Sequence, residues 1–148
     1  MNLRRVIIGK PEIRRLIPHS GSMCLLDGVM EWNDESIICV SETHREPTNP
    51  LRRRDQLSAV HAFEYGAQAA AIHGGVRAHA AGTTAPPGYL AALRDAQLNV
   101  ERLDDITSPL QVEARRLFGE AVNTVYECKV LVDDKLLASA RVTIMLRS

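Results

Sequence analysis

The feature that most constrains the fold is an almost uncharged stretch over residues 57–75, whose length corresponds to about five helical turns. A helix on the surface of a domain normally carries a charged face, and this stretch lacks one. Its small residues would let other backbone approach closely on most sides: Ala59, Ala62, Gly66, Ala67, Ala69, Ala70 and Ala71. The pair Gly74–Gly75 suits a C-terminal cap. The pattern predicts a central helix wrapped by a sheet.

Three polar side chains share one face of this predicted helix. His61, Glu64 and Gln68 are separated by three, four and seven positions. A carboxylate among apolar residues costs free energy unless it is paired or hydrogen-bonded. Glu64 therefore has two interpretations: a buried structural contact with His61 one turn away, or an acid or base in a site lined by the helix.

Length and charge limit the classes of function. The chain has 148 residues, which fits one domain over residues 1–148 with a real core. Lys plus Arg and Asp plus Glu are 18 each, and this zero net charge argues against a dedicated nucleic-acid binder, which needs excess positive charge. The cluster Arg52–Arg53–Arg54 precedes the predicted helix. It is either solvated surface or a contact for an acidic partner or a phosphate.

The cysteines and the N-terminal residues indicate the cellular compartment in which the protein is expected. Cys24, Cys39 and Cys128 lie in apolar, strand-like runs, as buried hydrophobes do in a reducing environment. No cysteine or histidine spacing indicates a metal, and no nucleotide or metal cofactor is expected. The N-terminal apolar run is too short for a signal peptide, and no segment could span a bilayer. We therefore expect a cytoplasmic protein with no membrane partner.

Periodicity and turn residues predict the remaining elements. A short helix is expected over residues 11–17, two strand-like runs over 23–32 and 35–43 around Asn33–Asp34, and a loop over 76–88. Four strands are expected over 89–100, 110–118, 124–132 and 136–146, the last two joined at Asp133–Asp134. The order predicts an α+β domain in which an antiparallel sheet of about six strands curls around one long helix.

Two motifs in the chain support a family resemblance. Residues 17–29 read Ile-Pro-His-Ser-Gly-Ser-Met-Cys-Leu-Leu-Asp-Gly-Val, and residues 63–69 read Phe-Glu-Tyr-Gly-Ala-Gln-Ala. They resemble the opening segment and the helix motif of hotdog-fold dehydratases, which act on 3-hydroxyacyl groups carried by acyl carrier protein. Residues 49–53, 64–68 and 88–91 resemble the ApeP-like subgroup, associated with aryl polyene-type pigments. The resemblance implies a hotdog fold and a role in fatty acid, polyketide or aryl polyene-type biosynthesis.

The resemblance also implies roles for single residues. Glu64 takes the place of the acid or water-positioning group, a backbone amide near Ala59 polarises the thioester carbonyl, and Gln68 and His19 belong to the substrate site. The fatty-acid dehydratases carry a catalytic histidine in a Gly-His-Phe-Pro segment, where this chain has Thr-Asn-Pro-Leu. Asn49 occupies the histidine's position, and an amide cannot act as a general base. His61 is a weaker candidate for the base.

A missing base has a consequence for assembly. In dimers of the family that this chain resembles, the histidine and the acid of one site come from different subunits. The resemblance thus implies one half of a heterodimeric dehydratase, in which Glu64 meets the histidine of a second hotdog subunit. A two-subunit arrangement is also expected because a single such sheet leaves the helix partly uncovered and exposes an apolar face, and a homodimer is the alternative to a heterodimer.

Two other functions remain open. In a hotdog acyl thioesterase, Glu64 would activate water or attack the thioester carbonyl. In a non-catalytic subunit, the chain would bind acyl carrier protein or a partner, with Arg52, Arg53 and Arg54 as the carrier contact.

Overall fold

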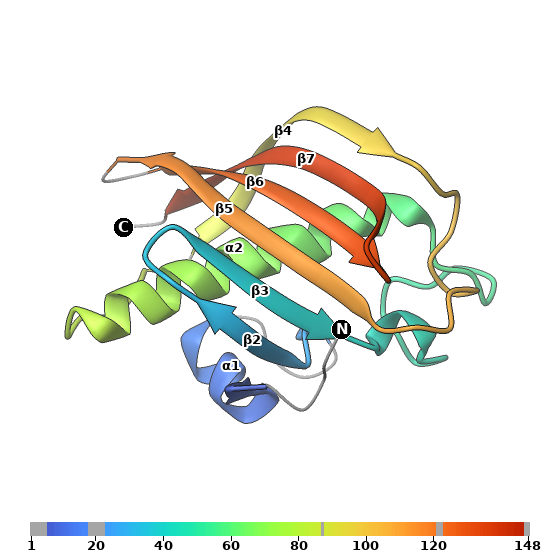
Figure 1. Cartoon of the computed structure of the whole chain (residues 1–148), viewed down its shortest axis with the longest axis horizontal. Helices are drawn as coiled ribbons and strands as arrows, with labels where there is room; N and C mark the ends of the chain where they lie inside the picture. The colour runs from blue at the N-terminus through green and yellow to red at the C-terminus, as the bar shows by residue number, and fades with distance from the viewer. Residues whose placement is uncertain (1–5, 18–22, 87, 121–122, 147–148) are drawn as a thin grey trace.

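A computed structural model describes residues 6–17, 23–86, 88–120 and 123–146. Within them, seven strands form one antiparallel sheet in the order β1-β2-β3-β5-β6-β7-β4, which curves over the long helix α2 (Figure 1). The strands are β1 (Ile8–Gly9), β2 (Gly28–Trp32), β3 (Ser36–Ser41), β4 (Gly88–Leu98), β5 (Leu110–Gly119), β6 (Asn123–Val132) and β7 (Lys135–Leu146). The helices are α1 (Lys10–Leu16), α2 (Ala62–Ala80) and the 3-10 turns η3 (Thr43–Arg45) and η4 (Ala59–His61). The predicted α+β architecture is confirmed.

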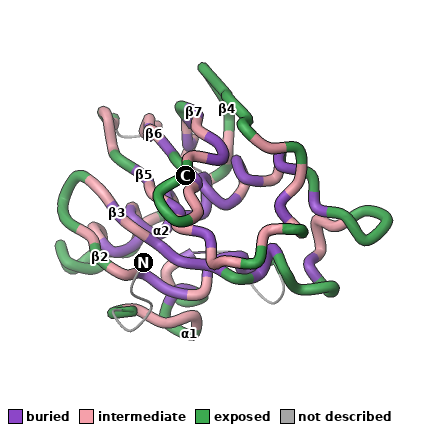
Figure 2. Tube along the Cα trace, turned by 45° about the vertical axis from the view of Figure 1, so that its right-hand side comes forward, coloured by how far each residue is buried: buried purple, intermediate pink, exposed green. Residues whose placement is uncertain are grey.

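The helix α2 is buried along most of its length, as its small residues predicted. Buried positions follow one another around the helix, so that several sides contact other parts of the chain (Figure 2). At Gly66, an added Cβ would lie 2.8 Å from Cβ of Cys128 on β6. Only a glycine allows this approach, which is why the helix can lie directly against the sheet.

The predicted ends of the central helix were wrong at both sides. The chain forms the 3-10 turn η4 before α2 begins at Ala62, and α2 continues through Gly74–Gly75 to Ala80. Gly75 serves packing and not capping, because an added Cβ would lie 2.8 Å from the carbonyl oxygen of Leu16 in α1. The left-handed glycine is Gly82, with φ of 77°. Residues 76–80, expected as loop, are therefore helical.

The two predicted hairpin turns are confirmed. At the β2–β3 turn, the side-chain oxygen of Asn33 accepts hydrogen bonds from the main-chain N–H groups of Glu35 (2.8 Å) and Ser36 (2.9 Å). At the β6–β7 turn, Asp133 and Asp134 have φ of 49° and 67°, the left-handed pair typical of two-residue hairpin loops. The alternating face of β7 is buried as expected, at Ala138, Ala140, Val142 and Ile144.

Two further differences concern the N-terminal part. The strand expected from residue 23 begins only at Gly28, because residues 23–27 cross α2 and bond to side chains. The short strand β1 was not expected; it pairs with β2 through Ile8–Val29 and Gly9–Gly28.

The strand β4 forms a long open edge of the sheet. It pairs with β7 along one side and lies at the end of the strand order (Figure 1). Most of its side chains are exposed, among them Tyr89 (47%) and Leu93 (41%). An uncovered edge of this length is a template for pairing with another strand.

Candidate active site

The carboxylate of Glu64 lies in a pocket between the helix and the open edge of the sheet. Glu64 is half-buried in the first turn of α2. The pocket has a volume of about 200 Å³, and its lining comes from α2, β4 and β7: Glu64, Ala67, Gln68, Ala71, Gly88, Tyr89, Leu90 and Ile144. The predicted acidic group thus faces a cavity beside the open edge.

The side chain of Gln68 connects this carboxylate to the segment that crosses α2. Its oxygen Oε1 accepts a hydrogen bond from the N–H of Leu25 (2.9 Å), which fixes the orientation of the amide. Nε2 then donates to the carbonyl of Met23 (2.7 Å) and to Oε1 of Glu64 (3.3 Å). Gln68 is fully buried and holds one oxygen of the Glu64 carboxyl group in place.

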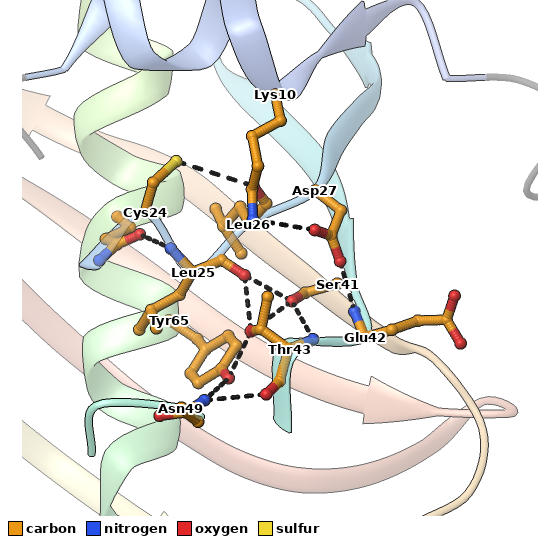
Figure 3. A network of polar contacts seen from close by, with 11 residues as sticks. Lys10, Cys24, Leu25, Leu26, Asp27, Ser41, Glu42, Thr43, Asn49 and Tyr65 are labelled. Atoms are coloured by element: carbon orange, nitrogen blue, oxygen red, sulfur yellow. Dashed lines mark hydrogen bonds and ion pairs between the residues drawn. The ribbon is translucent and has the colours of Figure 1, made fainter. Parts of the chain in front are cut away.

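Asn49, which the sequence resemblance sets against the family's histidine, is a buried structural residue. Both N–H bonds of the Asn49 amide are used, to the carbonyl of Thr43 (2.9 Å) and to the hydroxyl of Tyr65 (3.1 Å), and its oxygen accepts from the N–H of Leu51 (2.9 Å) (Figure 3). Asn49 is 5% exposed and does not line the Glu64 pocket. This side chain holds a loop and does not face the pocket.

The network around Asn49 has a fixed direction. Because Oγ1 of Thr43 donates its one proton to the carbonyl of Leu25 (2.7 Å), it must accept from the Tyr65 hydroxyl (2.7 Å), and that hydroxyl accepts from the Asn49 amide. Ser41 donates to the same carbonyl (2.5 Å). Burial raises the pKa of Tyr65 to about 12, so the phenol stays neutral.

Comparison with known proteins identifies the family. The sequence pattern of the ApeP-like family, described as ApeP dehydratase, matches residues 11–147. The chain belongs to the ApeP-like dehydratase family. No curated protein sequence matches it.

Solved structures show that the fold of this ApeP-like protein is the hotdog fold. A chain of "The Dehydratase Heterocomplex ApeI:P from Xenorhabdus doucetiae" has a TM-score of 0.84 at 20% identity, covering 92% of this chain and 91% of that chain. A putative thioesterase from Shewanella oneidensis has a TM-score of 0.60 at 14% identity, covering 93% and 100%. A thioesterase from Staphylococcus aureus has a TM-score of 0.58 at 10% identity, covering 82% and 93%.

Other residues predicted for the site of the ApeP-like chain lie around the start of α2. The main-chain N–H of Ala59 donates to the carbonyl of Glu101 (3.0 Å), so this amide is already used within the fold. His61 is half-buried at the end of η4 and does not line the Glu64 pocket. Burial, followed by the charge of Arg53, lowers the pKa of His61, and Glu64 acts in the opposite direction. His19 lies outside the described residues.

The three arginines before η4 divide into two kinds. Arg53 and Arg54 are exposed. Arg52 is half-buried and donates to the carbonyls of His44 (3.1 Å) and Asp55 (3.2 Å), which fixes the loop from inside. An acidic partner can therefore reach Arg53 and Arg54, whereas Arg52 is largely committed to the loop.

No sequence pattern indicated the role of His73. His73 is fully buried, because α2 extends beyond Gly75. Its Nε2 lies 2.8 Å from the carbonyl of Asn33 and donates to it, so Nδ1 accepts from the hydroxyl of Tyr126 (2.7 Å). Burial lowers the pKa of His73. His73 is a neutral structural link between α2, the β2–β3 turn and β6.

The described part of the chain contains neither a cluster of metal-binding side chains nor a helix that could span a membrane. There, no group of three or more histidine, cysteine, aspartate or glutamate residues is placed to hold a metal ion. No described helix is long and apolar enough to cross a bilayer.

Proposed function

We propose that this chain is one subunit of a two-chain dehydratase that removes water from 3-hydroxyacyl thioesters. The observation that carries the proposal is the difference between the surroundings of Glu64 and those of Asn49. Glu64 lines a pocket at an open sheet edge, while Asn49, which replaces the expected histidine, is locked in an internal network. An acid is present at the pocket, and the base must come from elsewhere.

The chemistry needs two proton transfers. A base removes the proton next to the thioester carbonyl, and an acid protonates the departing hydroxyl. We assign the second step to the Glu64 carboxyl group, whose orientation is maintained by the hydrogen bond from Gln68 (3.3 Å). The base is the imidazole of a second hotdog subunit.

The open edge at β4 supports this arrangement. Gly88, Tyr89 and Leu90 of β4 line the Glu64 pocket, so a strand that pairs with β4 would lie next to the pocket. A partner bound there brings its own side chains close to Glu64. The printed name of the ApeI:P structure describes a dehydratase heterocomplex, which is consistent with a partner of the same fold.

The positive charge of the loop before η4 is the basis for assigning an acyl carrier protein as a partner. Exposed Arg53 and Arg54 lie in the loop before η4, close enough for Arg53 to influence His61. We assign this loop to contact with the acidic surface of an acyl carrier protein.

Dehydration assays test the proposal. The chain alone, the chain with a histidine-bearing hotdog dehydratase subunit, and the same mixture with Glu64→Gln are compared for enoyl product from a 3-hydroxyacyl thioester. We expect no product from the chain alone, product from the mixture, and a loss of at least about 100-fold with Glu64→Gln. Glu35→Gln, an exposed turn residue, is the matched control and should retain the rate of the mixture.

Three outcomes contradict the proposal. Full dehydration by the chain alone would show that no second base is needed. Release of free thiol without an enoyl product would favour a thioesterase. Unchanged activity with Glu64→Gln would leave only a non-catalytic, partner-binding role.

A further inference from the structure

A second and larger hollow continues from the Glu64 pocket along α2. It has a volume of about 430 Å³ and lies between the C-terminal half of α2, the loop over residues 81–86 and the ends of β5, β6 and β7. Ala71, Gly88 and Ile144 line both hollows, so the two meet at these residues. Beyond Ala71, the helix contributes the small residues Gly74 and Ala78 to this hollow, and Ala81 follows directly after the helix.

The far end of the groove differs from its middle in polarity. The side chains of Arg77 and Arg116 line it together with the threonines Thr83, Thr84 and Thr124. Arg77 follows Glu64 by thirteen positions, which corresponds to about 20 Å along a helix. A ligand that reaches from Glu64 to this end is therefore long and meets hydrogen-bond donors there.

The position of Arg116 depends on a glycine. A Cβ added at Gly119, the last residue of β5, would lie 2.8 Å from Cζ of Arg116, well inside contact distance. The guanidinium folds back over this glycine toward the hollow. Burial lowers the pKa of His73 and raises the pKa of Tyr126; the nearby charge of Arg116 adds to the first shift and opposes the second.

The two arginines differ in their partners. Nε of Arg77 forms an ion pair with Asp34 (3.1 Å). Arg116 forms no ion pair with any carboxylate of the described residues, although Glu120 also lines the hollow. Its guanidinium can therefore donate to a ligand, and a hydrogen bond from a charged donor is stronger than one between neutral groups.

We propose that Arg116 is a specificity-determining residue that selects acyl chains whose far end carries an oxygen acceptor in place of a methyl group. The inference rests on the proposed function, because it takes the groove at Glu64 as the acyl site. It goes further because it names Arg116 as the residue that contacts the far end of the acyl chain and states which chemical group that end carries.

Binding to the wild-type chain tests the inference without requiring turnover. Three 3-hydroxyacyl pantetheine thioesters of equal chain length, ending in a methyl, a hydroxyl or a carboxylate group, are titrated calorimetrically into the chain and into its complex with a hotdog partner. We expect the hydroxyl and carboxylate ends to bind at least about tenfold more tightly than the methyl end. The readout is the ratio of the affinity for the hydroxyl or carboxylate end to the affinity for the methyl end. A change that affects all three thioesters equally does not alter this ratio.

Two variants connect the preference to Arg116. Arg116→Gln should bring the ratio close to one. Gly119→Ala should do the same while Arg116 is still present, because the added methyl group displaces the flexible end of that side chain at little cost to the fold. An unchanged melting temperature for Gly119→Ala shows that the fold is intact. Arg115→Gln removes an exposed arginine from the same strand, outside both hollows, and should keep the wild-type ratio.

The outcomes separate this inference from the proposed function. Equal affinity for all three ends in the wild-type chain, or a preference that survives in both variants, would overturn the role of Arg116 and leave the dehydratase proposal standing. Failure of every thioester to bind, alone and in the complex, would overturn both.

Discussion

At the scale of single residues, the proposal of a divided active site depends on Asn49 and Glu64. Asn49 uses both of its N–H donors and accepts one hydrogen bond inside the chain. Glu64 is held by Gln68 at a pocket. Asn49 is therefore part of the scaffold, whereas the Glu64 carboxyl group, the proposed acid, lies beside a cavity.

The directed network predicts the effect of an isosteric change at Asn49. In Asn49→Asp, a buried carboxylate would face the carbonyl of Thr43 with no N–H to donate, so we expect a loss of about 3 kcal/mol in the free energy of unfolding. Urea denaturation measures this loss. Asn99→Asp is the matched control: this exposed amide donates to the carbonyl of Leu136, and solvent can replace that bond. Equal effects at the two sites would contradict the structural role of Asn49.

At the scale of elements, the two neighbouring glycines of α2 have different roles. No atom lies within 4 Å of a Cβ added at Gly74, whereas one added at Gly75 meets the Leu16 carbonyl at 2.8 Å. We expect Gly74→Ala to stabilise the protein by about 0.5–1 kcal/mol through helix propensity. Gly75→Ala should destabilise it, because α1 must move. Thermal denaturation of both variants checks this, and a stabilising Gly75→Ala would contradict the packing described.

The edge strand β4 predicts where a partner binds. The pairing of β4 with β7 is irregular at two places, between Leu90 and Ala92 and between Arg94 and Gln97, where Asp95 has φ of 53°. Leu93 lies between the two irregularities, on the side of the second one that leads to the Glu64 pocket, whereas Leu98 lies beyond it. Leu93 and Leu98 are similarly exposed, at 41% and 43%. Leu93→Lys should weaken association with the partner by about tenfold or more, and Leu98→Lys should change it little. Analytical ultracentrifugation of the mixed subunits distinguishes these results; a larger effect at Leu98 would place the interface elsewhere.

The periodicity of apolar residues predicted which helices and strands form better than it predicted where they end. The alternation in β5 and β7 and the Asn33–Asp34 and Asp133–Asp134 turns depend on local chemistry, which the sequence carries directly. The end of α2 depends on which glycine touches α1, and that contact is not local. The site follows the same rule: Glu64 stood out because a carboxylate in an apolar helix needs an explanation, whereas the bonds of Asn49 and the position of Arg116 over Gly119 required coordinates.

At the scale of the whole molecule, stability should fall in mild acid. Burial lowers the pKa of His44 and of His73 below the ordinary value of 6.5. At His73 the charges of Arg77 and Arg116 act in the same direction, and Asp34 opposes them. The unfolded chain therefore binds more protons than the folded chain below about pH 6.5, and stability is lost as the pH falls further.

Denaturation in urea at pH 7.5 and pH 5.5 measures this loss, which can reach about 1.4 kcal/mol per pKa unit for each histidine. His73→Gln should show a smaller difference between the two pH values than the wild-type chain. His79→Gln serves as the control, because His79 is exposed on the last turn of α2. An equal loss in His73→Gln would remove His73 from the explanation.

Under the proposed function, the whole molecule supplies an acid and an open sheet edge and needs a second subunit for the base. The most direct measurement is a titration of this chain into a fixed amount of a histidine-bearing hotdog subunit, with the rate of enoyl formation as the readout. We predict no activity from either chain alone and a rate that rises linearly and stops rising at a one-to-one ratio. A full rate from either chain alone, or no break at the equimolar point, would contradict a site shared between two subunits.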